Sequence, residues 1–145
     1  MPSMRGGRVI VVGCGTFGAS LASSLSRAGR QVCVVDMDQA SFGRLSADFD
    51  GETVTGSGTN VSVLEGCGVA DASTVVAATD RDTVNVLIGE MASDIYGVAH
   101  VYARVDDEAL VAIAEDHSVE TICPHLLCAL EFYRLAGLSS GVSAQ

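Results

Sequence analysis

The chain has 145 residues, 48% of them hydrophobic, and a formal net charge of −10. This length is typical of a single domain with a substantial core. All eight basic residues are arginines, and an acidic chain without a basic cluster argues against nucleic acid or an anionic membrane surface as partner. No apolar run approaches the roughly 18 residues of a membrane span, so we expect no direct membrane insertion.

The first predicted element is a strand at 9–12, an unbroken run of β-branched residues. Such runs are typical of strands buried on both faces of a parallel sheet. Further strand candidates follow at 32–35, 53–55, 75–78, 98–103 and 119–122.

The segments between these strands have apolar residues at helical spacing. One such set is Val84, Leu87, Ile88, Met91 and Ile95. Alternating strands and helices favour repeated right-handed crossovers. We therefore predict an α/β, Rossmann-like, doubly wound parallel sheet of six strands in the order 3-2-1-4-5-6, followed by an exit helix.

The turn after the first strand carries a glycine pattern, G-x-G-x-x-G, at Gly13, Gly15 and Gly18. In a strand-turn-helix context these glycines permit a tight turn, close approach of a pyrophosphate, and close helix packing. The amides of the first helical turn would then face the anion. The predicted phosphate loop also includes Cys14, Thr16 and Phe17.

Asp36 ends the second predicted strand and is followed by Met37. A carboxylate at this position can accept hydrogen bonds from both ribose hydroxyls and repels a 2′-phosphate. The sequence therefore favours NAD(H), or ATP, ADP or AMP, over NADP. A tight strand-to-helix turn that binds no ligand is the structural alternative.

A second polar cluster, Ala78, Thr79 and Asp80, follows the fourth predicted strand. In doubly wound sheets, ligands lie at the carboxyl ends of the first and fourth strands, which would place this cluster beside the phosphates or the second ribose. Thr79 or Asp80 could equally cap the helix that runs through Val84. Both interpretations stay open at this point, and one residue can serve both roles.

The five cysteines, odd in number and without a C-x-x-C pair, are expected to be reduced thiols in a cytoplasmic protein. Cys123, His125 and Cys128 lie close together, and Cys67 is a conceivable fourth ligand, but the spacing fits no common zinc pattern. We therefore predict no metal site. The sequence also lacks an evident acid–base–nucleophile set, so we predict no catalytic residues.

Several motifs, taken in order, resemble the RCK-N domain, also called KTN or TrkA-N. They are the glycine loop, the acidic second strand in "VVDMD", the stretch "TGSGTNVSVLEGCGVADASTVVAATDRDTVNVLIGEMA", the fifth strand in "VYARVDD", and the last strand in "VETICPHLL". The resemblance covers 8–138. We accordingly predict a dinucleotide-binding domain at 1–138 and a flexible tail at 139–145.

The resemblance implies further site residues. Ser57 and Gly58 would lie near the adenine, where the family usually has an aspartate in place of Ser57. Thr16 stands where members that prefer ATP or ADP often have an arginine, which favours NAD(H) here. Arg104 could supply a positive charge instead, or form a salt bridge with Asp106 or Asp80.

The function implied by the resemblance is nucleotide sensing by a non-enzymatic regulatory domain of a potassium uptake or channel system. Such a domain would act at the inner face of the cell membrane through a membrane channel or transporter subunit. It would assemble as a homodimer or larger ring through the exit helix, whose segment "HLLCALEFYRLAGL" is apolar on more than one face. The alternative is the cofactor domain of an NAD-dependent oxidoreductase whose substrate domain is not in this sequence.

Overall fold

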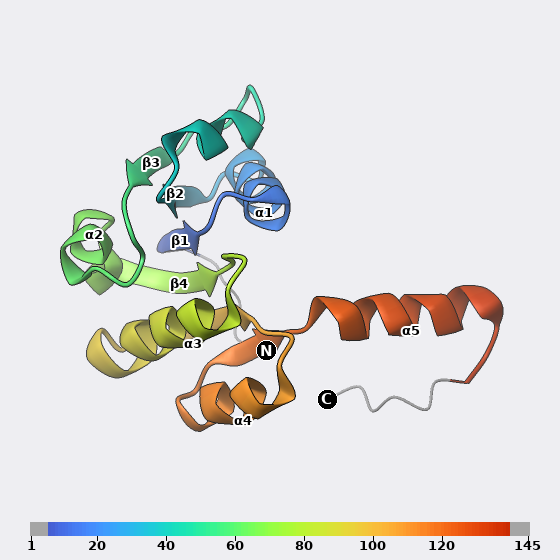
Figure 1. Ribbon diagram of the computed structural model, residues 1–145. Coiled ribbons are helices and arrows are strands. Elements are labelled where there is room, and N and C mark those ends of the chain that lie inside the picture. Colours follow the sequence, from blue (N-terminus) through green and yellow to red (C-terminus); the bar gives the residue numbers. More distant parts are fainter. Residues whose placement is uncertain (1–5, 140–145) are drawn as a thin grey trace.

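The computed structural model describes residues 6–139 and contains one parallel sheet in the order β3-β2-β1-β4-β5-β6. This confirms the predicted order 3-2-1-4-5-6 (Figure 1). The strands are β1 (Arg8–Val12), β2 (Gln31–Asp36), β3 (Glu52–Thr55), β4 (Ala72–Ala77), β5 (His100–Arg104) and β6 (Glu120–Ile122).

Helices connect all six strands, and a final helix leaves the sheet. The α-helices are α1 (Thr16–Arg27), α2 (Val61–Gly66), α3 (Asp82–Glu90), α4 (Glu108–Asp116) and α5 (Pro124–Ala136). Shorter segments are the 3-10 helices η1 (Gln39–Arg44) and η2 (Val69–Asp71) and the π-helical turn η3 (Met91–Ile95). The predicted flexible tail lies outside the described residues except for Ser139.

The central strands of the sheet are apolar on both sides, and helices cover both of their faces. Ile10 and Val12 of β1 face the larger core, which α2, α3 and α4 cover. Val9 and Val11 face the smaller core, which α1 and η1 cover. All four side chains are at most 2% exposed, as expected for a parallel sheet.

Two connections differ from the predicted pattern. The crossover from β2 to β3 contains the 3-10 helix η1 in place of a full α-helix. The α3 segment widens into the π-helical turn η3, which changes the rotation per residue. As a result Ile95, predicted on the buried face, is 61% exposed. Leu87, also predicted there, lies in α3 before this turn at the edge of the apolar face and is 46% exposed, while Ile88 and Met91 are buried.

The glycine loop is packed against its own helix and against the end of β4. Gly18 is in contact with the loop, since a Cβ there would lie 1.8 Å from the carbonyl oxygen of Gly13. Gly13 has φ +106°, and a Cβ on it would lie 2.6 Å from the carbonyl oxygen of Ala78. Only glycine allows this approach of α1 to β1 and β4.

Asn85 is a fully buried polar side chain in α3 that ties two strand ends together. Its Oδ1 accepts from the Thr79 backbone N–H at 2.9 Å and from the Thr79 hydroxyl at 2.6 Å. Its Nδ2 donates to the carbonyl oxygens of Thr79 at 3.0 Å and Arg104 at 2.9 Å. The amide therefore holds the ends of β4 and β5 at a fixed separation.

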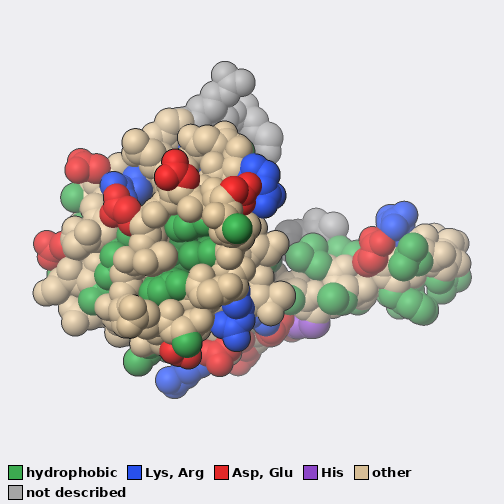
Figure 2. Space-filling view, turned by 90° about the horizontal axis from the view of Figure 1, so that it is seen from above, with side chains coloured by type: hydrophobic (Ala, Val, Ile, Leu, Met, Phe, Trp, Pro, Cys, Tyr) green, Lys and Arg blue, Asp and Glu red, His purple; other side chains and the backbone are tan. Residues whose placement is uncertain are grey.

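The exit helix α5 projects from the body of the domain (Figure 1). None of its residues is buried, and hydrophobic side chains are spread along it (Figure 2). Leu127, Phe132 and Leu135 within the helix, and Leu138 just after it, are between 56% and 71% exposed. Of the helices in residues 6–139, none has both the length and the apolar character needed to cross a membrane.

We predict that Gly18→Ala destabilises the fold by about 2 kcal/mol or more, because the added methyl group overlaps the Gly13 carbonyl and must push α1 outward. Urea unfolding measures this as a lower midpoint. Gly66→Ala is the matched control, since a Cβ there meets nothing within 4 Å. Equal midpoints for the two variants would contradict the packing described above.

We also predict that Asn85→Ala lowers the free energy of unfolding by about 2–4 kcal/mol, because backbone groups of Thr79 and Arg104 lose their partners in a buried site. Asn60→Ala is the control: Asn60 caps α2 through Ser62, and losing an exposed cap costs about 1 kcal/mol. If Asn85→Ala lowers the free energy of unfolding no more than Asn60→Ala does, the Asn85 hydrogen bonds contribute little to stability.

Candidate functional site

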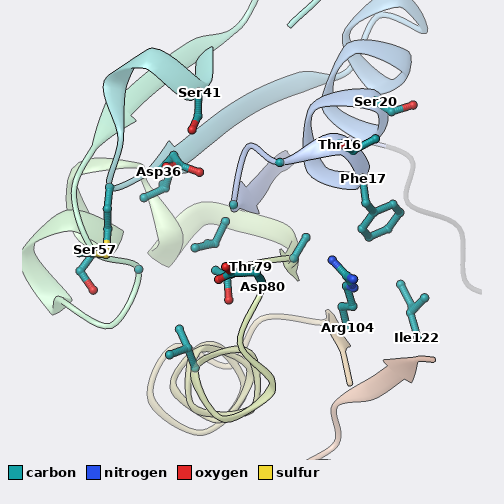
Figure 3. Close-up of a pocket in the computed structure, with 18 of the residues that line it drawn as sticks. Thr16, Phe17, Ser20, Asp36, Ser41, Ser57, Thr79, Asp80, Arg104 and Ile122 are labelled. Atoms are coloured by element: carbon teal, nitrogen blue, oxygen red, sulfur yellow. The ribbon is translucent and has the colours of Figure 1, made fainter. Parts of the chain in front are cut away.

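A pocket of about 850 Å³ opens at the carboxyl ends of the strands, where the chain crosses to opposite faces of the sheet after β1 and β4. Its volume is that of a typical ligand site. Most predicted site residues line it (Figure 3): Gly13, Gly15, Thr16, Phe17, Asp36, Met37, Ser57, Gly58, Ala78, Thr79, Asp80 and Arg104. Segments far apart in the sequence thus meet around one cavity.

Two predicted site residues, Cys14 and Gly18, do not line the pocket. Both are buried, Cys14 within the glycine loop and Gly18 in the first turn of α1. The Cys14 thiol donates to the carbonyl oxygen of Ser41 at 3.3 Å. Burial, and next the charge of Asp36, raise the pKa of this thiol, which keeps it protonated and unreactive. Cys14 therefore contributes packing and its backbone amide to the site.

Asp36 is half-buried at the end of β2 and is held by two backbone amides. Its Oδ2 accepts from the N–H of Cys14 at 2.7 Å, and its Oδ1 accepts from the N–H of Asp38 at 2.8 Å. A carboxylate has about four lone-pair sites, so each oxygen keeps a position for a further donor. The side chain thus both ties the glycine loop to the β2–η1 turn and presents acceptors to the pocket.

Positive potential on the opposite side of the pocket comes from Arg104 and from the start of α1. The Arg104 guanidinium points into the cavity (Figure 3) and forms no salt bridge with Asp80 or Asp106. The first N–H groups of α1, beginning at Thr16, have no carbonyl partner within the helix. A Cβ at Gly15 would meet nothing within 4 Å, so the loop backbone is open to an anion.

The turn after β4 does not cap α3 in the predicted way. The helix begins at Asp82, its N-cap is Arg81, and no side chain caps it. The Thr79 hydroxyl instead bonds with Asn85 and accepts from the Arg81 N–H at 3.2 Å. The capping interpretation is therefore wrong for both Thr79 and Asp80, and both residues line the pocket.

Sequence reasoning missed part of the pocket wall. The additional lining residues are Val12, Ser20, Val35, Ser41, Gly56, Val84, Ile122, Pro124 and Leu127. Ser20 lies one helical turn beyond Thr16, and this spacing could have indicated it. Leu127 could not have been found this way, because it belongs to α5 and reaches the pocket only through the path of that helix. Asn85, which positions Thr79 and Arg104, was detectable as an amide in an apolar helix.

Two curated relatives match most of the chain. One is the Trk system potassium uptake protein TrkA of Streptomyces coelicolor, which is 32% identical over 114 residues, 79% of this chain and 51% of the relative. The other is a TrkA homolog of Archaeoglobus fulgidus, which is 32% identical over 140 residues, 93% of this chain and 31% of the relative. The chain thus spans about half, or less, of their length.

Three solved structures share the fold. The TrkA-N domain of the inner membrane protein ybaL from Escherichia coli has a TM-score of 0.81 at 15% identity, covering 89% of this chain and 96% of that one. The Shewanella denitrificans Kef CTD in its AMP-bound form has a TM-score of 0.70 at 23% identity, and the match covers 91% of this chain and 83% of that one. The GsuK channel bound to NAD has a TM-score of 0.67 at 18% identity, and the match covers 84% of this chain and 22% of that one.

The sequence pattern of one domain family, described as the TrkA-N domain, matches residues 9–124. That span begins in β1 and includes the glycine loop, Asp36, the turn after β4, and Arg104. It therefore contains the elements that build the pocket, apart from most of α5. From this match, the chain belongs to the TrkA-N domain family.

Proposed function

We propose that this chain is a nucleotide-sensing regulatory subunit or domain of a potassium uptake or channel system. The proposal depends on one pocket that has an anchored carboxylate, Asp36, on one side and on the other the guanidinium of Arg104, which forms no salt bridge within residues 6–139. A nucleotide has matching chemistry, with ribose hydroxyls at one end and phosphates at the other. The names of the TrkA relatives support the potassium assignment.

NAD(H) is the nucleotide that we favour, with ATP, ADP or AMP as alternatives and NADP disfavoured. The Asp36 carboxylate would accept from the ribose hydroxyls and repel a 2′-phosphate. Met37 beside it is 76% exposed, and a bound adenine would cover its side chain near Ser57 and Gly58. NAD is bound by the GsuK channel and AMP by the Kef CTD, both of which share this fold.

The phosphates would lie between the start of α1 and Arg104. The free amides of the first helical turn suit a pyrophosphate, and the guanidinium can form charge-assisted hydrogen bonds with it. Thr16 supplies no charge, so Arg104 would be the main cation at the ligand. This arrangement fits two linked phosphates better than a triphosphate, which needs more positive charge.

We propose a sensor in preference to an oxidoreductase. The described residues that line the pocket include the carboxylates of Asp36 and Asp80 but no histidine, lysine or cysteine, which are the usual acid–base and nucleophilic groups at neutral pH. Nucleotides would act by binding two states of an assembly with different affinity, which is the requirement for any such coupling. The assembly would sit at the cytoplasmic side of the membrane, against a channel or transporter subunit.

Homodimerisation through α5 is part of this proposal. An isolated helix with an apolar surface is stable only if that surface is covered. The sheet has a matching uncovered region: on the α1 side of β5, His100 and Tyr102 are only half-buried, while Val101 and Ala103 on the other side are buried. Two copies could cover each other reciprocally about a two-fold axis, and dimers could assemble into rings.

We predict that calorimetry gives NADH at least about tenfold tighter binding than NADPH, a difference of about 1.4 kcal/mol. Asp36→Asn should weaken NADH binding and reduce the ratio between the two ligands, because a neutral amide does not repel the 2′-phosphate. Asp116→Asn makes the same charge change at the exposed end of α4 and should leave the ratio unchanged. NADPH bound as tightly as NADH would overturn the ribose assignment.

We predict that the chain is a dimer by light scattering at micromolar concentration, and that Phe132→Glu or Leu135→Glu makes it monomeric. Both side chains are more than 60% exposed on α5, and a buried carboxylate at the dimer contact would be costly. Leu87→Glu, at a leucine that is 46% exposed on α3, is the control and should stay dimeric. A wild-type monomer would refute assembly through α5.

A further inference from the structure

The carboxyl ends of β5 and β6 bring together three side chains that the pocket does not use. Asp106 follows β5, while Cys123 and His125 flank Pro124 at the start of α5. The strands are parallel neighbours, and the Val105 N–H donates to the Ile122 carbonyl at 2.9 Å. This backbone contact fixes Asp106 beside Cys123, although the two residues are distant in the sequence.

The three potential ligand atoms form a compact triangle. Asp106 Oδ1 lies 3.1 Å from His125 Nδ1 and 3.9 Å from Cys123 Sγ, and Sγ lies 3.3 Å from Nδ1. For zinc bound tetrahedrally at ordinary bond lengths, neighbouring ligand atoms lie about 3.4–3.6 Å apart. The observed separations differ from this by only a few tenths of an ångström.

The chemistry of the set fits the same ion. Zinc binds thiolate sulfur, imidazole nitrogen and carboxylate oxygen, and this cluster offers one of each. A thiolate and a carboxylate together neutralise the charge of Zn²⁺.

A hydrogen-bonded surface network is the competing explanation. In that case the thiol and imidazole would simply satisfy the carboxylate. Sγ also lies 3.7 Å from Nε2, so the imidazole must turn before one nitrogen faces the centre of the triangle. The His125 side chain is 62% exposed and the Asp106 side chain is 44% exposed, so most of the imidazole borders solvent and water can reach a fourth coordination position.

We propose that Asp106, Cys123 and His125 form a binding site for Zn²⁺, with water as the fourth ligand. The cysteines considered from the sequence have other environments: Cys67 is buried against Cys33, and Cys128 is exposed on α5. The sequence pattern of cysteines and His125 does not include Asp106, because this third ligand comes from the separate loop after β5. The site does not depend on the proposed nucleotide function.

The ion would join the first turn of α5 to the loop after β5. Cys123 lies between Ile122 and Pro124, and both of these line the nucleotide pocket, as does Arg104 two residues before Asp106. Zinc would therefore hold the exit helix at a defined angle directly behind the pocket wall. An ion that binds only the folded arrangement of these ligands stabilises the segments it joins.

The test uses the full chain, reduced and free of metal, with Zn²⁺ alone titrated against a chromophoric chelator. We expect one Zn²⁺ per chain, with affinity reduced at least about tenfold in Cys123→Ser and in His125→Gln. Cys128→Ser is the matched control, a thiol on the same helix outside the cluster, and should bind as the wild type does. Co²⁺ should give a thiolate charge-transfer band that Cys123→Ser abolishes.

Three outcomes would overturn the site: no binding by the wild type at micromolar Zn²⁺, unchanged binding by Cys123→Ser and His125→Gln, or a loss in Cys128→Ser equal to that in Cys123→Ser. Circular dichroism shows whether each variant is folded. NADH calorimetry on the same preparations separates the two proposals. Zinc binding without NADH binding would refute only the nucleotide assignment, and the reverse result would refute only the metal site.

Discussion

The reversal of crossover direction between β1 and β4 is the constraint on which the site depends. The chain leaves β1 toward β2 on one side and leaves β4 toward β5 on the other, so the two turns diverge above adjacent strands. No backbone fills the space between them, and the pocket lies there. Close contact of Gly13 with Ala78 keeps the floor of this space narrow. The polar and charged side chains of the pocket, such as Asp36 and Arg104, surround that floor.

Much of this arrangement was predictable because it depends on local sequence. Buried β-branched runs specify strands, and the glycine pattern specifies the first turn. The place of Asp36 in the pocket was predictable because this residue ends β2. Contributions from distant segments were not predictable in the same way, as Leu127 shows. Its place in the pocket depends on the direction of α5, which no local pattern encodes.

Register across the sheet explains the other omissions. Asp106 joins Cys123 and His125 only because β5 and β6 pair with Arg104 opposite Ile122. Asn85 bonds to Thr79 and Arg104 only because α3 lies over the ends of two neighbouring strands. The predicted face of that helix was partly wrong because η3 is a π-helical turn. A wider turn changes which side chains face the core without changing the apolar composition.

The same geometry links the pocket to the exit helix. Leu127 lines the cavity from α5, and Arg104 lies on the strand before the loop that contacts the start of that helix. In the proposed sensor, a ligand that moved Arg104 or covered Leu127 would therefore favour some directions of α5 over others. No residue of α5 is buried, so little packing within residues 6–139 opposes a change in the direction of the helix. A small displacement at the base of a projecting helix becomes a larger one toward its tip, where Phe132 and Leu135 are exposed and would meet a second copy in the proposed dimer.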